Sequence, residues 1–132
     1  MNVLIIDNNP EFALSLKDML QRESHQAVVV GDGQSGLRLA ATRQFDVILL
    51  DIVMPGESGI SFLLAAHQMK LDTPVVAMDA LFNHRINKRV AELGAADFLK
   101  KPVSVSRLRA VLAGISNAHT ALHGSSTIAD EG

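Results

Sequence analysis

Residues 47–51 read Val-Ile-Leu-Leu-Asp, four apolar residues in a row followed at once by a carboxylate. The apolar run is continuous rather than alternating, which is typical of a strand buried on both faces of a parallel sheet. Similar runs occupy residues 3–6, 27–30 and 75–78, and a weaker one lies at 98–99. The sequence therefore predicts five buried strands.

Helical periodicity fills the stretches between these runs. The first predicted helix begins at Pro10, with Asn9 as its N-cap. Apolar residues at helical spacing follow in four further stretches, at residues 34–43, 59–69, 83–94 and 105–115. Strand and helix thus alternate, which predicts an α/β fold with a parallel sheet and helices on both faces. In such sheets, functional residues collect at the carboxyl ends of the strands.

Length and composition narrow the class of protein. A chain of 132 residues with 48% hydrophobic content fits one domain. The absence of Cys excludes a disulfide framework, a zinc–thiolate site and a cysteine nucleophile. No apolar run approaches the roughly 18 residues of a membrane span. We expect a cytoplasmic protein without a membrane partner, in which residues 1–115 form the domain and the polar residues 116–132 form a linker or a disordered C-terminal tail.

Polar side chains follow the predicted strands at the point where each strand ends. In order along the chain, these residues are Asp7, Asn8 and Asn9, then Asp51, then Asp79, then Lys101. Carboxylates and one ammonium at neighbouring strand ends suit Mg²⁺ and a transferring phosphoryl group. The alternative is that the Asp and Asn residues only cap the turns that follow the strands.

In these segments the chain resembles the receiver domain of bacterial two-component response regulators, over about residues 1–115. The matching segments are Ile6-Asp7-Asn8-Asn9-Pro10, Leu49-Leu50-Asp51-Ile52-Val53-Met54-Pro55-Gly56, Gly59 and residues 94–102, which end in Lys101-Pro102. The resemblance implies a flavodoxin-like (CheY-like) fold, a doubly wound five-stranded parallel sheet with helices on both faces.

The resemblance also implies roles for single residues. Asp51 is expected to accept a phosphoryl group from a histidine kinase, and Lys101 to pair with the phosphoryl oxygens. The peptide bond before Pro102 is expected to be cis, an isomer that is common only before proline. The residues expected to hold Mg²⁺ are Asp7, Asn8, Asp51 and, through its backbone carbonyl, Val53.

Two positions depart from the family pattern. Asn8 replaces a second acidic residue that ligates the metal, and its neutral amide is expected to weaken Mg²⁺ binding. Asp79 replaces a Thr or Ser whose hydroxyl binds the phosphoryl group. A carboxylate there would face the phosphoryl group as a like charge. The repulsion costs about 4 kcal/mol at a separation of ~4 Å with an effective dielectric near 20. Three interpretations of Asp79 stay open: it compensates for Asn8 across the pocket, it pairs with Lys101 and locks an unphosphorylated state, or it points outward and caps the next loop.

Three apolar residues match positions that modulate the family's switch. Phe98 matches the switch aromatic and is equally well explained as strand core. Val53 and Leu81 match positions that set the rate of phosphoryl hydrolysis. Because both are apolar, we expect them to shield a phosphorylated form from water.

The first functional hypothesis is a phosphoryl-accepting signal receiver with Mg²⁺ as cofactor, a regulatory switch rather than a turnover enzyme. Its partner would be a sensor histidine kinase or a phosphotransfer protein. The second hypothesis is a degenerate receiver that binds proteins without being phosphorylated. A third is a ligand-binding flavodoxin-like domain, for which the chain lacks a phosphate-binding loop.

The formal net charge of −2 is the sum of two opposed halves. Residues 1–79 hold ten acidic and five basic residues, which gives −5, and residues 80–132 hold four acidic and seven basic residues, which gives +3. The predicted fourth helix, fifth strand and fifth helix form a face that we expect to contact an output domain or a target protein. An acidic protein fits this face better than nucleic acid does, and a homodimer stays open. The basic residues on and around it are Arg85, Lys88, Arg89, Lys100, Arg107 and Arg109.

Overall fold

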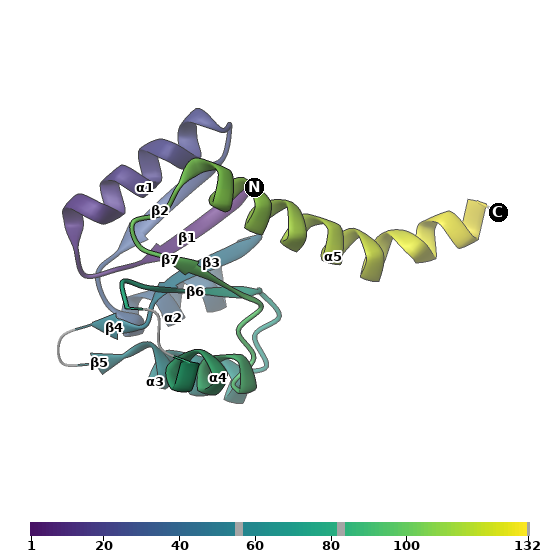
Figure 1. Ribbon diagram of the computed structural model, residues 1–132. Coiled ribbons are helices and arrows are strands. Elements are labelled where there is room, and N and C mark those ends of the chain that lie inside the picture. Colours follow the sequence, from purple (N-terminus) through teal and green to yellow (C-terminus); the bar gives the residue numbers. More distant parts are fainter. Residues whose placement is uncertain (55–56, 82–83, 132) are drawn as a thin grey trace.

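A five-stranded parallel sheet lies at the centre of the computed structural model, with strand order β2-β1-β3-β6-β7 (Figure 1). The structure describes residues 1–54, 57–81 and 84–131, with residues 57–58 and 120–131 described as backbone only. Strand β1 pairs with β2 on one side and with β3 on the other, so the strand order reverses there. The α/β fold predicted from the sequence is confirmed. The strands are β1 (Asn2–Ile6), β2 (Gln26–Val30), β3 (Val47–Asp51), β6 (Val75–Asp79) and β7 (Asp97–Lys100).

Helices cover both faces of this sheet. One buried cluster joins α1 and α5 to the sheet, and a second cluster joins α2, α3 and α4 to the opposite face. As predicted, α1 begins at Pro10, and the side chain of its N-cap Asn9 accepts a hydrogen bond from the N–H of Phe12. The helices are α1 (Pro10–Arg22), α2 (Gly33–Thr42), α3 (Gly59–Gln68), α4 (His84–Glu92) and α5 (Val105–Glu131).

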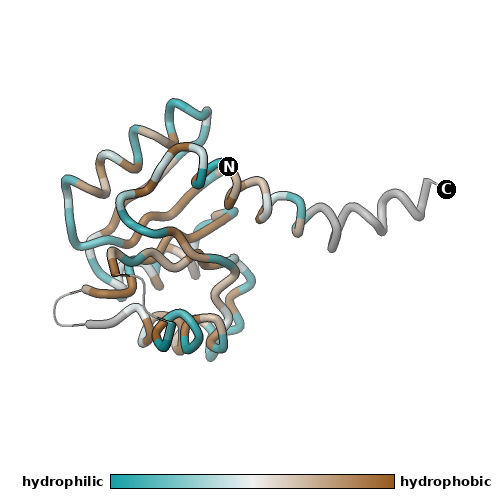
Figure 2. The backbone as a smooth tube through the Cα atoms, viewed as in Figure 1, coloured by the Kyte–Doolittle hydropathy of each residue, from teal (hydrophilic) through white to brown (hydrophobic). Residues whose placement is uncertain are grey.

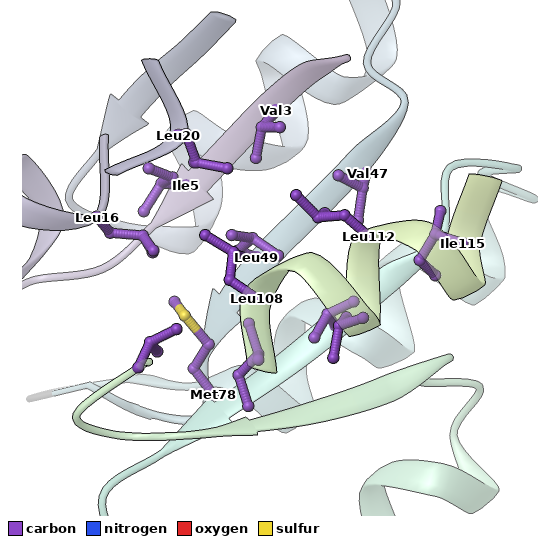
Figure 3. Close-up of a cluster of buried hydrophobic side chains, with 14 of the residues drawn as sticks. Val3, Ile5, Leu16, Leu20, Val47, Leu49, Met78, Leu108, Leu112 and Ile115 are labelled. Carbon is purple, nitrogen blue, oxygen red and sulfur yellow. The ribbon is translucent and has the colours of Figure 1, made fainter. Parts of the chain in front are cut away.

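The cluster under α1 and α5 shows how the helices fix the sheet (Figure 3). Leu16 and Leu20 of α1, together with Leu108 of α5, are at most 1% exposed. They pack on strand residues that point to the same face, such as Val3 and Ile5 of β1. Figure 2 shows this arrangement by hydropathy. The central strands are mostly hydrophobic, and the helices around them alternate between hydrophobic and hydrophilic residues. Burial of this kind stabilises by about 25 cal/mol per Å² of apolar surface.

Two glycines allow close approaches on the other face. A Cβ on Gly36 in α2 would overlap the side chain of Ile6, so the glycine permits the helix to lie directly on β1. Gly59 opens α3, and a Cβ there would lie 2.8 Å from the Cα of Ile52 and 3.0 Å from the carbonyl oxygen of Asp51. Both approaches bring helices against the strands that carry Asp7 and Asp51.

Two features differ from the sequence predictions. A short antiparallel pair, β4 (Val53–Met54) and β5 (Glu57–Ser58), follows β3 and was not predicted. The last helix was predicted to end near Ile115, but α5 continues to Glu131 and extends away from the sheet (Figure 1). The segment after Ile115 is polar in composition, but it contains no proline that would end a helix. The assignment of residues 116–132 to a linker or tail stays a prediction.

None of the helices in the described part of the chain combines the length and apolarity that crossing a bilayer requires.

Candidate functional site

Three charged residues meet at the carboxyl edge of the sheet. Asp7 directly follows β1, Asp51 is the last residue of β3, and Lys101 directly follows β7. Among the described residues, the two fully buried charged ones are Asp7 and Asp51, at 2% and 6% exposure. The reversal of strand order beside β1 brings them together, as predicted for an open α/β sheet.

The ammonium of Lys101 lies between the two carboxylates. Its Nζ is 2.7 Å from Oδ2 of Asp7 and 3.5 Å from Oδ2 of Asp51. Two carboxylates against one ammonium leave a net charge of −1 in a pocket largely removed from water. Uncompensated buried charge is unfavourable, so this pocket favours a further cation.

The environment of Asp51 raises the pKa of its carboxyl group. Burial is the largest cause, and the charge of Asp7 acts in the same direction. Lys101 opposes the rise, as does the N–H of Val53, which donates to Oδ1 of Asp51 at 3.2 Å. Desolvation of the carboxylate outweighs the attraction of the neighbouring ammonium here.

The oxygen atoms at this edge fit a hard divalent cation. Oδ1 of Asp7 accepts the N–H of Asn9 at 2.8 Å, while its buried Oδ2 accepts no hydrogen bond and has only the ion pair with Lys101. Asp51 adds a second carboxylate, and the exposed Asn8 adjoins Asp7 in the chain. Within the described ranges, no three carboxylate or imidazole side chains lie close enough to hold one metal ion. A cation here would therefore depend on two carboxylates supplemented by neutral oxygens.

The backbone around Lys101 is tied to the neighbouring strand. The N–H of Lys101 donates to the carbonyl oxygen of Asp79 at 2.8 Å, which extends the β6–β7 pairing by one residue. The Lys101–Pro102 peptide bond is cis, as expected.

Asp79 is the last residue of β6, and its two carboxylate oxygen atoms lie in different environments. Oδ1 accepts the N–H of Leu81 at 3.1 Å, and Oδ2 is buried without a hydrogen-bond partner. Lys101 forms its ion pairs with Asp7 and Asp51, and none joins it to Asp79, so the locked pair is not found. Asp79 also does not complete a three-carboxylate metal group. The hydrogen bond to Leu81 agrees with the loop-capping interpretation, but the buried Oδ2 shows that the carboxylate does not point fully outward.

The three apolar positions that match the family's switch lie as follows. Phe98 is half-buried and packs against the cluster under α2, α3 and α4. Val53 is 63% exposed and Leu81 is 76% exposed. Both side chains are thus exposed, and their shielding of a phosphorylated form from water stays a prediction.

The basic face is narrower than the sequence indicates. Arg107 pairs with Asp97 at 3.2 Å, and Arg109 pairs with Glu23, so both arginines have partners within the chain. Helix α4 packs on the body through Val90, its one fully buried residue, and through the partly buried Ile86. Helix α4 and strand β7 also carry the exposed basic residues Arg85, Lys88, Arg89 and Lys100.

Sequence reasoning missed one residue of the site, Phe12. Its ring lies under the ammonium of Lys101, with Nζ 4.2 Å from the ring centroid. From sequence alone, Phe12 is an apolar residue in the first turn of a predicted helix. Its position one turn after the Asp7 loop was the available signal.

Comparison with known proteins identifies the family. The sequence matches the family "Response regulator receiver domain" over residues 3–113. It is 35% identical over 114 residues to the transcriptional regulatory protein CpxR of Escherichia coli (strain K12), covering 83% of this chain and 48% of that protein. It is 36% identical over 116 residues to the sensory transduction protein RegX3 of Mycolicibacterium smegmatis, covering 84% and 50%.

The chain thus spans about half the length of the curated relatives it matches. Among solved structures, the receiver domain of the Francisella response regulator 1452 has a TM-score of 0.82 at 28% identity, covering 89% of this chain and 98% of that one. The chain belongs to the response regulator receiver domain family.

Proposed function

We propose that this chain is a phosphoryl-accepting signal receiver, in which Asp51 takes a phosphoryl group from a sensor histidine kinase or a phosphotransfer protein. The observation that carries the proposal is the buried pocket in which Asp51 and Asp7 converge on Lys101. An ordinary turn-capping role would not require two buried carboxylates around one ammonium.

The chemistry is a transfer between two nucleophiles. A carboxylate oxygen of Asp51 attacks phosphorus, a P–O bond forms, and the P–N bond to the donor histidine breaks with its electron pair going to the imidazole nitrogen. The product is an acyl phosphate on Asp51. The hydrogen bond from the N–H of Val53 fixes the rotation of the carboxylate during attack.

Lys101 neutralises charge that builds up when two anions approach. Mg²⁺, held by the carboxylates of Asp7 and Asp51, the amide of Asn8 and the backbone carbonyl of Val53, would supply the remaining positive charge. A receiver domain of similar fold, from the sensor histidine kinase PA1611 of Pseudomonas aeruginosa, is described with a magnesium ion coordinated in its active site cleft. The neutral amide of Asn8 predicts weaker Mg²⁺ binding than an Asn8→Asp variant would have.

The proposed output surface is the face formed by α4, β7 and α5. Exposed cations on it favour an acidic protein surface as partner. The relatives CpxR and PfeR are named as a transcriptional regulatory protein and a transcriptional activator protein. These names support an output that controls transcription through a further part of a longer protein. We also propose that the domain acts in the cytoplasm, as a regulatory switch without catalytic turnover.

The test is phosphorylation by acetyl phosphate, with an Asp51→Asn variant as control. We expect wild-type protein to acquire one base-labile phosphoryl group, as an acyl phosphate is, only when Mg²⁺ is present, and the variant to acquire none. Labelling of the variant at the wild-type level would refute Asp51 as acceptor. If the wild-type protein is labelled equally well when a chelator is present from the start of the reaction, the metal requirement is refuted.

A further inference from the structure

Phe12 contacts the one cation in the described part of the pocket. It is the third residue of α1, and its half-buried ring packs against the cluster under α1 and α5. Nζ of Lys101 lies 4.2 Å from the ring centroid, well within the roughly 6 Å over which a ring face attracts a cation. The side chain of Lys101 is only 15% exposed, so water screens this contact weakly.

The contact closes a cycle of four residues at the start of α1. Oδ1 of Asp7 accepts the N–H of Asn9 at 2.8 Å, and Oδ1 of Asn9 accepts the N–H of Phe12 at 3.2 Å. The ring of Phe12 then meets the ammonium of Lys101, which returns to Oδ2 of Asp7 at 2.7 Å. The beginning of the helix, the first carboxylate and the ammonium are therefore held together as one unit.

We propose that Phe12 is a positioning residue, which holds the ammonium of Lys101 between its ring face and Asp7. The role in phosphoryl transfer rests on the proposed function. A lysine side chain has four flexible methylene groups, so a second support beside Asp7 restricts the positions of Nζ. That restriction keeps the ammonium 3.5 Å from Oδ2 of Asp51, close to where charge develops during attack. A leucine at position 12 would preserve apolar packing but provide no aromatic face.

The test compares Phe12→Leu with Phe12→Tyr, which keeps the ring. Phe45→Leu is the matched control, because Phe45 is also half-buried and lies under Arg43 at 5.3 Å, near the opposite edge of the sheet. By NMR, we expect ring-current upfield shifts of the Lys101 ε-methylene protons in wild type, Phe12→Tyr and Phe45→Leu, and their loss in Phe12→Leu. With acetyl phosphate and Mg²⁺, we expect Phe12→Leu to be phosphorylated about two- to fivefold more slowly, with wild-type rates in the other two variants.

Several results would overturn the proposal. One is a Lys101 shift that is the same in wild type and Phe12→Leu, and another is a wild-type phosphorylation rate in Phe12→Leu. Equal slowing by Phe45→Leu would show that lost packing, rather than the contact with Lys101, causes the effect. If wild type is labelled no more than Asp51→Asn, the proposed function fails instead, and the ring-current shift alone decides whether Phe12 holds the ammonium.

Discussion

Gly59→Ala is predicted to strain the backbone that carries Asp51. Gly59 opens α3, and its N–H donates to the carbonyl oxygen of Ile52 at 2.8 Å, so the helix begins directly against the end of β3. The added Cβ would lie 2.8 Å from the Cα of Ile52, whereas carbon atoms in good contact lie about 3.5–4.0 Å apart. The overlap involves backbone atoms, which cannot rotate away, so the end of β3 or the start of α3 must shift.

The magnitude follows from two opposing effects. Overpacking of this kind typically costs about 1–3 kcal/mol, while replacing Gly by Ala in a helix gains up to about 1 kcal/mol. We expect Gly59→Ala to lower the free energy of unfolding by about 1–2 kcal/mol. Gly114→Ala, in an exposed part of α5 where a Cβ meets nothing within 4 Å, is the matched control and should gain about 0.5–1 kcal/mol.

The assay is urea unfolding followed by far-UV circular dichroism, because the chain contains no Trp and no Tyr for intrinsic fluorescence. A second measurement is the rate of phosphorylation by acetyl phosphate, which should fall in Gly59→Ala because the carbonyl oxygen of Asp51 lies 3.0 Å from the new Cβ. A Gly59→Ala protein at least as stable as wild type would refute the reasoning, because β3 would then have room that the structure does not show.

Three further predictions concern the pocket. Asp51→Asn should be more stable than wild type at neutral pH: burial raises the pKa of Asp51, so wild type loses stability as pH rises from the ordinary Asp pKa of about 3.9 through the folded value. The advantage should vanish below about pH 4, and urea midpoints that differ equally at all pH values would contradict this. Asp79→Thr should lengthen the half-life of phosphorylated protein by at least about tenfold, since it removes a like charge; an unchanged decay rate would mean that Asp79 does not face the phosphoryl group. Val53→Asn should speed dephosphorylation severalfold by admitting water, and slower decay in that variant would show that Val53 does not shield the acyl phosphate.

The fold was predictable because its signals are local. Each buried strand is a short apolar run, and each helix carries its own stripe and cap, as at Asn9. The meeting of Asp7, Asp51 and Lys101 followed from a general property of parallel sheets with a reversal in strand order. These residues are far apart in sequence, but the topology leaves them one place to meet.

The remaining features depend on side-chain rotation or on length without a stop signal. The orientation of Asp79 could not be read from its position, because an Asp at a strand end can cap a turn or face a pocket. The contact between Phe12 and Lys101 joins two segments whose sequences say nothing about each other. The continuation of α5 beyond Ile115 escaped prediction because loss of an apolar stripe resembles the end of a helix.

The strands that carry the charged residues of the pocket differ in the number of neighbouring strands with which they pair. Asp7 directly follows β1 and Asp51 ends β3, and each of these strands is paired with neighbours on both sides. Lys101 follows β7, an edge strand of the sheet, which is paired with β6 alone. The two anions thus follow strands that are hydrogen-bonded on both sides, whereas the cation follows a strand that is hydrogen-bonded on one side only. A binding partner that shifts β7 would therefore move the positive charge of the pocket relative to its two negative charges.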